Sequence, residues 1–261
     1  MSPAADSAGQ PFEGRSFEPN PFQGDTGEAD PSFATALESF LDARSQLSAE
    51  DIDAAFAEII SALQFARLLV PLLAEAGDYG VTGEGKVVEK SQELSIPHVE
   101  GPDGRGVAPF FSSVQAMSAW NPSARPVPVE ASRAALATAS EGLALMVLDP
   151  GSDHSVVLRR SALQAVATGE PYVSPLSDEV VREALQAGWE PHRDAVVSFT
   201  VHSGDISRTL SGPEVVVSLA LVPGLSKEVL TNVLGEISAS WTANALLQAR
   251  VDGLGIKVVQ G

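Results

Sequence analysis

The sequence contains no cysteine among its 261 residues. This absence excludes disulfide bridges, thiolate nucleophiles, iron–sulfur clusters and zinc sites built from cysteine. A chain without cysteine suits a reducing compartment, and we expect a cytoplasmic protein.

Positive charge is scarce as well. The chain has 16 Lys and Arg residues against 34 Asp and Glu residues, which gives a net charge of -18 at pH 7. Affinity for nucleic acid depends on Lys and Arg side chains that neutralise phosphates. A chain this acidic is therefore not expected to bind DNA or RNA.

Long apolar runs and a secretory signal are also missing. The longest apolar candidate, residues 66–74, contains Arg67 and Pro71 and falls well short of the ~18 residues that span a membrane. The N-terminal 30 residues have no basic segment followed by an apolar one, so we expect no secretory signal. We therefore predict that the protein has no membrane partner.

Apolar residues make up 44% of the chain, which is enough for a real core, and the length favours two domains plus a tail. Residues 1–31 are rich in Pro, Gly, Ser, Asp and Glu and are predicted to form a disordered acidic tail. Phe12, Phe17 and Phe22 recur every five residues within it. Five is neither a helical nor a strand period, so chance spacing is favoured over a binding motif, although the motif stays open.

Residues 32–170 are predicted to form the first domain, which begins with two helices. The apolar face of the first is Phe33, Leu37, Phe40 and Leu41, and that of the second is Ile52, Phe56, Ile59 and Leu63, with Ser48 and Asp51 as a capping box. Because Pro71 disfavours a helix, we end the second helix near Ala66 and predict a strand over residues 68–73.

The rest of the first domain alternates strands and helices. Residues 93–99 are expected to pair with residues 106–111 across the Asp103-Gly104 turn, and Ser112 or Ser113 caps a helix that reaches Trp120. Further predicted elements are a helix over 130–141, a buried strand over 143–148, its hairpin partner over 155–158 and a helix over 161–168.

Residues 171–261 are predicted to form a second, smaller α+β domain of ferredoxin-like type, with the order helix, strand, strand, helix, strand. The first strand places Val197, Phe199 and Val201 on one face. The second does the same with Val215, Val217, Leu219 and Leu221, and Ser226 caps the last helix. The fold class expected for the whole chain is α+β.

Three segments together resemble a known family. They are Ala66-Arg67-Leu68-Leu69-Val70-Pro71, then Asp103-Gly104-Arg105 with Ala108-Pro109-Phe110-Phe111-Ser112-Ser113, then Leu148-Asp149-Pro150-Gly151 with Leu158-Arg159-Arg160-Ser161-Ala162-Leu163. Their order and spacing are similar to those of the SseB N-terminal domain family in its actinobacterial form, over about residues 33–170. The C-terminal part resembles that family's second domain more loosely.

The resemblance implies a fold and little chemistry. The family's name refers to enhanced serine sensitivity, which is a phenotype and not a mechanism, so no catalytic residues are carried over. The family commonly has Thr where this chain has Ser112, and often Asn where it has Asp149. Both replacements keep the capping or turn chemistry.

The few basic residues near the predicted turns are the candidate ligand-binding site. Arg105, Arg159 and Arg160, grouped beside the turn at Asp149, could grip a small carboxylate or an acidic peptide. The alternative is that these arginines pair with neighbouring Asp or Glu residues on the surface.

Other polar groupings are predicted to be structural. His192, Asp194, His202 and Asp205 could hold a metal only if they converged, and His202 falls on the solvent face of its strand, so neither a metal nor another cofactor is predicted. Adjacent residues of Asp153-His154-Ser155 cannot converge as a catalytic triad, and the glycine-rich residues 77–83 lack the Lys-Ser/Thr of a phosphate loop.

These observations favour a binding or regulatory module and not an enzyme, with a protein or a small anionic ligand as partner. The main alternative is an enzyme whose Asp, Glu, Arg and Ser residues meet in a cleft between the domains. A third is an interaction protein, which a broad exposed apolar patch would indicate. The sequence leaves the oligomeric state open.

Overall fold

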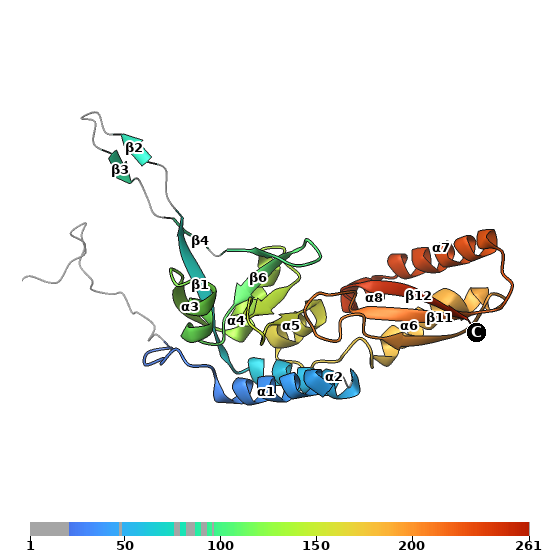
Figure 1. Cartoon of the computed structure of the whole chain (residues 1–261), viewed down its shortest axis with the longest axis horizontal. Helices are drawn as coiled ribbons and strands as arrows, with labels where there is room; N and C mark the ends of the chain where they lie inside the picture. Colours follow the sequence, from blue (N-terminus) through green and yellow to red (C-terminus); the bar gives the residue numbers. More distant parts are fainter. Residues whose placement is uncertain are drawn as a thin grey trace, which may run out of the picture.

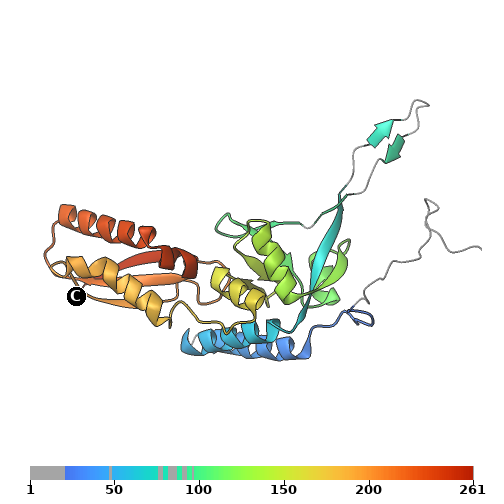
Figure 2. The same cartoon turned by 180° about the vertical axis from the view of Figure 1, so that it is seen from behind.

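A computed structural model describes residues 21–46, 49–75, 79–81, 87–89, 93–95 and 97–260 of the chain. Figures 1 and 2 show an elongated molecule in which the N-terminal and C-terminal halves lie end to end, with α1 (Pro31–Gln46) and α2 (Ala49–Leu63) along one side of the first half. Strands and helices are mixed in both halves, which confirms the α+β class. No described helix has both the length and the apolar character needed to cross a membrane.

Residues 21–30 have a defined position, although the sequence predicted a disordered tail that extended to residue 31. They contact the N-terminal half of the molecule. Asp25 forms a 2.7 Å ion pair with Arg67, and the backbone N–H of Val114 donates to the carbonyl of Gly27. The prediction was wrong for this stretch because these polar contacts leave no apolar period in the sequence. Residues 1–20 and Ser48 lie outside the described residues.

The long strand β1 (Arg67–Glu75) pairs antiparallel with β7 (Arg125–Glu130) on one side and, near its end, with β4 (Glu93–Ser95). The N–H and the carbonyl of Leu69 both bond Phe111, so Leu69 has none left for Pro128, its partner on β7. Antiparallel partners alternate between bonded and non-bonded pairs, so Pro71 and Pro126, two residues further along, also form a non-bonded pair. Prolines therefore fit inside this predicted strand without the loss of a ladder bond.

A four-stranded sheet forms the centre of the first half. Its order is β5 (Val99–Glu100), β6 (Gly106–Phe110), β8 (Met146–Leu148) and β9 (Val156–Leu158), and only the β6–β8 pair is parallel. The expected pairing of residues 93–99 with β6 holds only at β5. Pro97 interrupts the segment, and Glu93–Ser95 pairs instead with the end of β1, which is longer than predicted.

Three helices accompany this sheet. They are α3 (Val114–Trp120), whose first turn is capped by Ser113 as predicted, α4 (Ala131–Ser140) and α5 (Arg160–Thr168). The main core joins these elements to α1 and α2, and its buried side chains include Phe40, Phe56, Ile60, Met146 and Leu158. A short hairpin of β2 (Tyr79–Val81) and β3 (Val87–Glu89) is a separate sheet.

The C-terminal half has its own core around a three-stranded sheet. The elements are α6 (Glu179–Trp189), a 3₁₀ turn (Glu190–His192), β10 (Val196–His202), β11 (Val215–Leu221), α7 (Lys227–Ala243), α8 (Ala245–Arg250) and β12 (Leu254–Gln260). Ser226 caps α7 as predicted, and Val215, Val217, Leu219 and Leu221 are all buried. Residues 171–178 are described and contain no strand, so this half lacks the first strand of the ferredoxin-like order. As a result β11 and β12 pair directly and in parallel.

One strand of this half differs from its predicted pattern. A register shift between Val196 and Ser198 turns Val196 into the core, and Val197 is exposed. Phe199 and Val201 keep the expected inward face, where the Phe199 ring contacts Trp189. A bulge of this kind adds one residue and changes the alternation, which a pattern of period two cannot predict.

Candidate functional site

The structure brings two of the predicted site residues together and leaves the other two apart. Arg105 and Arg159 both bind the carboxylate of Asp252, at 2.9 Å from its Oδ2. Arg160 is exposed and donates to the carbonyl of Gln248. Asp149 lies elsewhere, where it accepts hydrogen bonds from Ser112.

The arginine pair belongs to a network of charges between the two halves. Arg159 also binds Asp205 at 2.7 Å and donates to the carbonyl of Gly212, while Arg105 pairs with Asp103. Asp205 accepts further bonds from the backbone of Thr209, Leu210 and Ser211 and from the Ser211 hydroxyl. These bonds fix residues 203–213 in place.

That connection of the C-terminal half reaches across to the first domain. The carbonyl of Arg208 accepts the N–H of Val157 at the free side of β9, and the Arg208 guanidinium pairs with Asp53 and lies 4.6 Å from the centre of the Phe56 ring. Leu210 packs into a small core with Val107 and Val157. The connection therefore joins the two halves by both polar and apolar contacts.

Buried carboxylates beside this network differ in their proton affinity. Burial alone raises the pKa of Asp205, but hydrogen bonds from Arg159, Thr209 and Ser211 outweigh it and the pKa lies below its usual value. For Glu214 burial prevails over the N–H of Asp252 and the nearby arginines, so its pKa is raised. The pKa values of these two acids are thus shifted in opposite directions.

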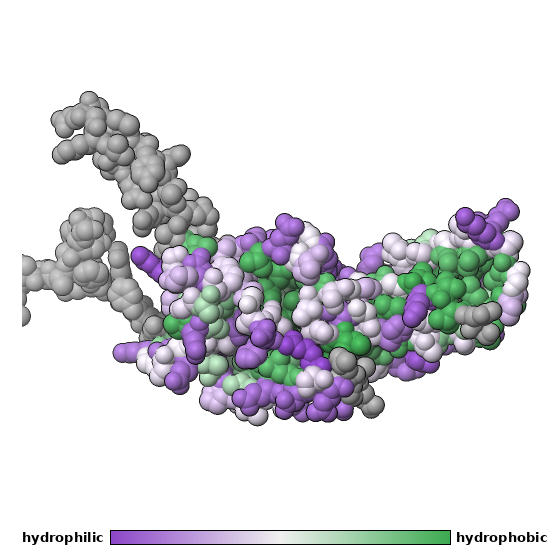
Figure 3. All heavy atoms as spheres, in the orientation of Figure 1, coloured by the Kyte–Doolittle hydropathy of each residue, from purple (hydrophilic) through white to green (hydrophobic). Residues whose placement is uncertain are grey.

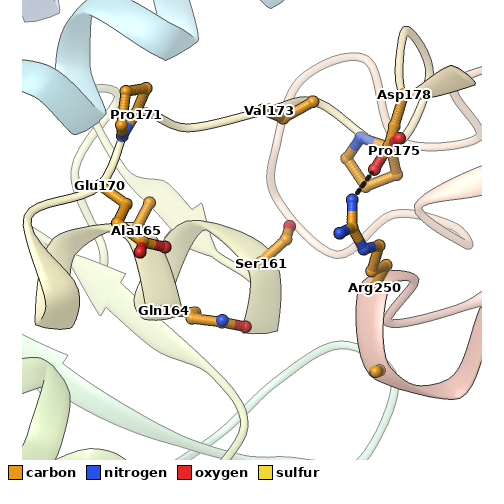
Figure 4. A pocket seen from close by; sticks show the side chains of 10 residues that line it. Ser161, Gln164, Ala165, Glu170, Pro171, Val173, Pro175, Asp178 and Arg250 are labelled. Carbon is orange, nitrogen blue, oxygen red and sulfur yellow. Dashed lines mark hydrogen bonds and ion pairs between the residues drawn. The ribbon is translucent and has the colours of Figure 1, made fainter. Parts of the chain in front are cut away.

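Two cavities adjoin the network. One of about 510 Å³ is lined by Arg105, Arg159, Asp103 and Asp252 together with residues 210–213, and every one of these four charged side chains already has an ionic partner. Figure 4 shows the other, of about 170 Å³, between α5, the segment that follows it and Arg250, whose guanidinium binds Asp178. The second cavity is too small for a substrate-sized molecule.

A third cavity, of about 540 Å³, is a groove between α1 and α3. We call it the α1–α3 groove. Apolar side chains form its walls, and they are Ala29, Phe33, Ala34, Leu37 and Leu41 around α1 and Ala116 and Ala119 on α3. Hydrogen bonds link the polar lining residues Ser112, Asp149, Ser152 and His154 to one another, and we call this cluster, with Ser113 beside it, the polar end of the groove. Glu38 and Gln115 also line the groove. Its volume, its apolar walls and its few converging polar groups are typical of a ligand-binding site.

The polar end is built by the two segments that resemble the SseB pattern. The parallel strands β6 and β8 finish side by side, so Ser112 and Asp149 follow at the same edge of the sheet. The carboxylate of Asp149 accepts the N–H of Ser112 at 2.8 Å and its hydroxyl at 2.7 Å. Ligands in open α/β sheets commonly bind at this edge, where parallel strands end.

Asp149 is an unusual residue in its setting. Its backbone φ is +49°, in the left-handed region that Asp tolerates better than most residues, and its side chain is buried. Burial raises its pKa, which the bonds from Ser112 and the charge of His154 oppose only in part. Strained backbone and a perturbed carboxyl in one cavity are features that concentrate at functional sites.

The remaining candidates do not assemble into chemistry. His192 lies 3.6 Å from Glu236 and Asp205 binds Arg159, and among the described residues no three His, Asp or Glu side chains are grouped to hold a metal. Residues 153–155 form a turn whose carbonyls at Asp153 and Ser155 accept from Arg44. Of the glycine-rich residues 77–83 only 79–81 are described, and they form β2.

The comparisons with known proteins bear on the domain that contains the polar end of the groove. Residues 41–165 match the family model of the SseB protein N-terminal domain. No curated protein and no solved structure matches the chain. The actinobacterial form and the likeness of the C-terminal half to the family's second domain stay predictions. The matched residues include Ser112, Asp149 and His154, and the match assigns residues 41–165 to the SseB N-terminal domain family.

Proposed function

We propose that the protein is a non-catalytic binding module that holds a mainly apolar ligand or partner side chain in the α1–α3 groove. The observation that carries the proposal is the combination of about 540 Å³ of groove, apolar walls and one polar end around the buried carboxyl of Asp149. Cytoplasmic localisation remains a prediction from the sequence.

The charge of the groove indicates which ligands it favours. Glu38 and Asp149 line it, and none of the described residues around it is Lys or Arg, so a neutral or cationic group is favoured over an anion. The small anionic ligand predicted from Arg105, Arg159 and Arg160 would instead bind beside the charge network. There it would compete with carboxylates that already occupy Arg105 and Arg159.

The absence of catalysis is part of the proposal and has its own support. The hydroxyl of Ser112 already donates to Asp149, and the same carboxylate takes the Ser112 N–H, so the pair acts as a brace between two loops. An enzyme that used this pair, which lies outside the cleft of the alternative hypothesis, would need Asp149 as a general base for the serine, a role that a raised pKa suits.

Three probes that share one ring and differ in charge test the proposal: benzamide, benzamidine and benzoate. Amide NMR shifts on titration are expected at α1, α3 and Ser112 for benzamide and benzamidine, at millimolar concentration, and not for benzoate. Ala119→Trp should fill the groove and abolish these shifts, whereas Ala137→Trp, at an exposed position of α4, should keep them. Benzoate shifts around Arg105 and Arg159, without groove shifts from any probe, would favour the anion site and contradict the proposal.

A further inference from the structure

The C-terminal sheet ends in a strand whose outer side has no partner among the described residues. β12 pairs with β11 alone, over all seven of its residues. Such an edge presents a row of free backbone N–H and C=O groups that can pair with another strand. The opposite edge, β10, carries a bulge, a feature that protects edges, whereas the β11–β12 register runs without a shift.

The same edge exposes apolar side chains that extend the core. Ile256 is in register with buried Val217, and Val258 with buried Leu219, so both lie on the face of the sheet that packs against the helices. Yet Ile256 and Val258 are 37% and 42% exposed. The apolar layer on this face therefore continues to the β12 edge, where its side chains are exposed.

The long helix α7, which precedes α8 and β12, also leaves an apolar stripe uncovered. Of the 17 residues of α7 only Ile237 and Trp241 are buried, while Leu230, Val233 and Leu234 are half-buried and Val229 is exposed. Figure 3 shows apolar side chains gathering over the end of the C-terminal half beside α7. An exposed apolar patch of this kind marks an interaction surface.

We propose that a second copy of this chain covers the surface, with the two β12 strands paired antiparallel about a two-fold axis to make one six-stranded sheet. A two-fold interface needs a patch that is complementary to itself, and an apolar edge strand meets this need. All helices would remain on the same face, and the two α7 helices would meet above the paired strands.

The side chains of β12 select the register. Pairing centred on Lys257 would place two ammonium groups opposite each other, which is unfavourable. Pairing centred on Ile256 sets Ile256 against its counterpart, Val258 against Leu254 and Lys257 against Gly255, so the apolar side chains on the helix-covered face of the edge meet one another. Centring on Val258 would instead set Ile256 against Gln260.

The size of the surface suits a weak dimer. A strand of seven residues is about 23 Å long and a helix of 17 residues about 25 Å, in two layers about 10 Å apart. Each of the two layers adds about 10 Å to the height of the face, so the face measures about 500 Å² per copy. This area is toward the low end of specific interfaces. The net charge of -18 opposes association, so the dimer is expected at micromolar concentration and to strengthen with salt.

Sedimentation velocity of the full chain from about 1 to 200 µM in 0.15 M salt tests the proposal. The weight-average mass is expected to rise toward twice that of the monomer. Val258→Asp should hold the chain as a monomer, and the same change on the other edge, Val197→Asp, should leave the dimer intact. A monomer throughout the range, or loss of the dimer in Val197→Asp alone, would overturn the proposal.

A second measurement does not depend on Val258→Asp remaining folded. Because the chain has no cysteine, Ile256→Cys introduces a single thiol, and the proposed register brings two such residues to the short distance that a disulfide spans. Mild oxidation should convert most of this variant into a covalent dimer within the concentration range where the wild type associates. Val197→Cys, more exposed but on the other edge, should stay a monomer, and equal crosslinking of both variants would show random collision and refute the β12 pairing.

Discussion

Arg159 and Asp205 form a 2.7 Å ion pair in which both side chains are almost completely buried. Arg159 follows β9 in the N-terminal half and Asp205 follows β10 in the C-terminal half, so the pair joins the two halves. Asp252, also buried, accepts from the same guanidinium. The removal of Arg159 would leave the buried carboxylate of Asp205 without its charged partner and Asp252 with Arg105 alone.

Arg159→Met is therefore expected to lower the free energy of unfolding by about 3–5 kcal/mol, the usual cost of an uncompensated buried charge. Arg160→Met is the matched control, because the neighbouring guanidinium is exposed and makes one bond to a carbonyl. Its cost should stay below about 1 kcal/mol. Urea denaturation of both variants measures the difference, and equal costs would mean that the buried network contributes nothing specific.

Glu214 predicts a dependence of stability on pH. A carboxyl whose pKa is raised in the folded state holds its proton more tightly when folded, so its contribution is present below the ordinary value of 4.5 and is lost as pH rises through the folded pKa. Glu214→Gln removes this loss and keeps an oxygen for the N–H of Asp252. The variant should gain on the wild type as pH rises above 4.5, by at most about 1.4 kcal/mol per pH unit.

The comparison is made by urea denaturation at pH 4.5, 5.5, 6.5 and 7.5. Asp205 does not interfere, because its lowered pKa confines its effect to more acidic solutions, where stability falls as the carboxylate takes up a proton. A difference between variant and wild type that stays constant over this range would contradict the assignment of a raised pKa.

Regular elements of the fold followed from the sequence, and the joints between them did not. The apolar stripes predicted α1, α2 and β11, and the capping residues Ser113 and Ser226 marked the starts of α3 and α7. The connection at residues 203–213 has no period, because its place depends on Asp205 accepting bonds from the residues that follow it. Such bonds are visible only once the chain has turned back on itself.

The sequence could predict one residue of the candidate site but not the cavity that contains it. Asp149 was singled out from its turn, and its partner Ser112 was one of two possible caps, of which Ser113 is the actual one. The groove wall was not foreseen, because Phe33, Leu37 and Leu41 form an ordinary core stripe in sequence. Only the position of α1 against α3 leaves part of that stripe facing a space.

Substitutions of Asp149 test whether its hydrogen bonds to Ser112 stabilise the fold. Asp149→Asn should cost less than about 1 kcal/mol, because Asn tolerates a positive φ and its oxygen can still accept from the Ser112 N–H. Asp149→Ala should cost about 2–4 kcal/mol, because it leaves a buried N–H and hydroxyl unpaired and places Ala in a strained backbone. Thermal and urea unfolding measure the stability of both variants. An Ala variant as stable as the Asn variant would show that the brace is dispensable.

Two helical glycines give the sharpest test of packing in the C-terminal half. A Cβ at Gly188 of α6 would clash with Nε1 of Trp241, which is buried and donates to the carbonyl of Leu185. Gly188→Ala must displace this indole and should cost about 1–3 kcal/mol. At Gly235 of α7 no atom lies within 4 Å of the added carbon, so Gly235→Ala should instead stabilise by about 0.5–1 kcal/mol through helix propensity. In urea denaturation we expect the two variants to change the free energy of unfolding in opposite directions. Only Gly188→Ala should change the Trp fluorescence. A neutral Gly188→Ala would mean that α6 and α7 are packed less closely than the 2.9 Å bond between Trp241 and Leu185 requires.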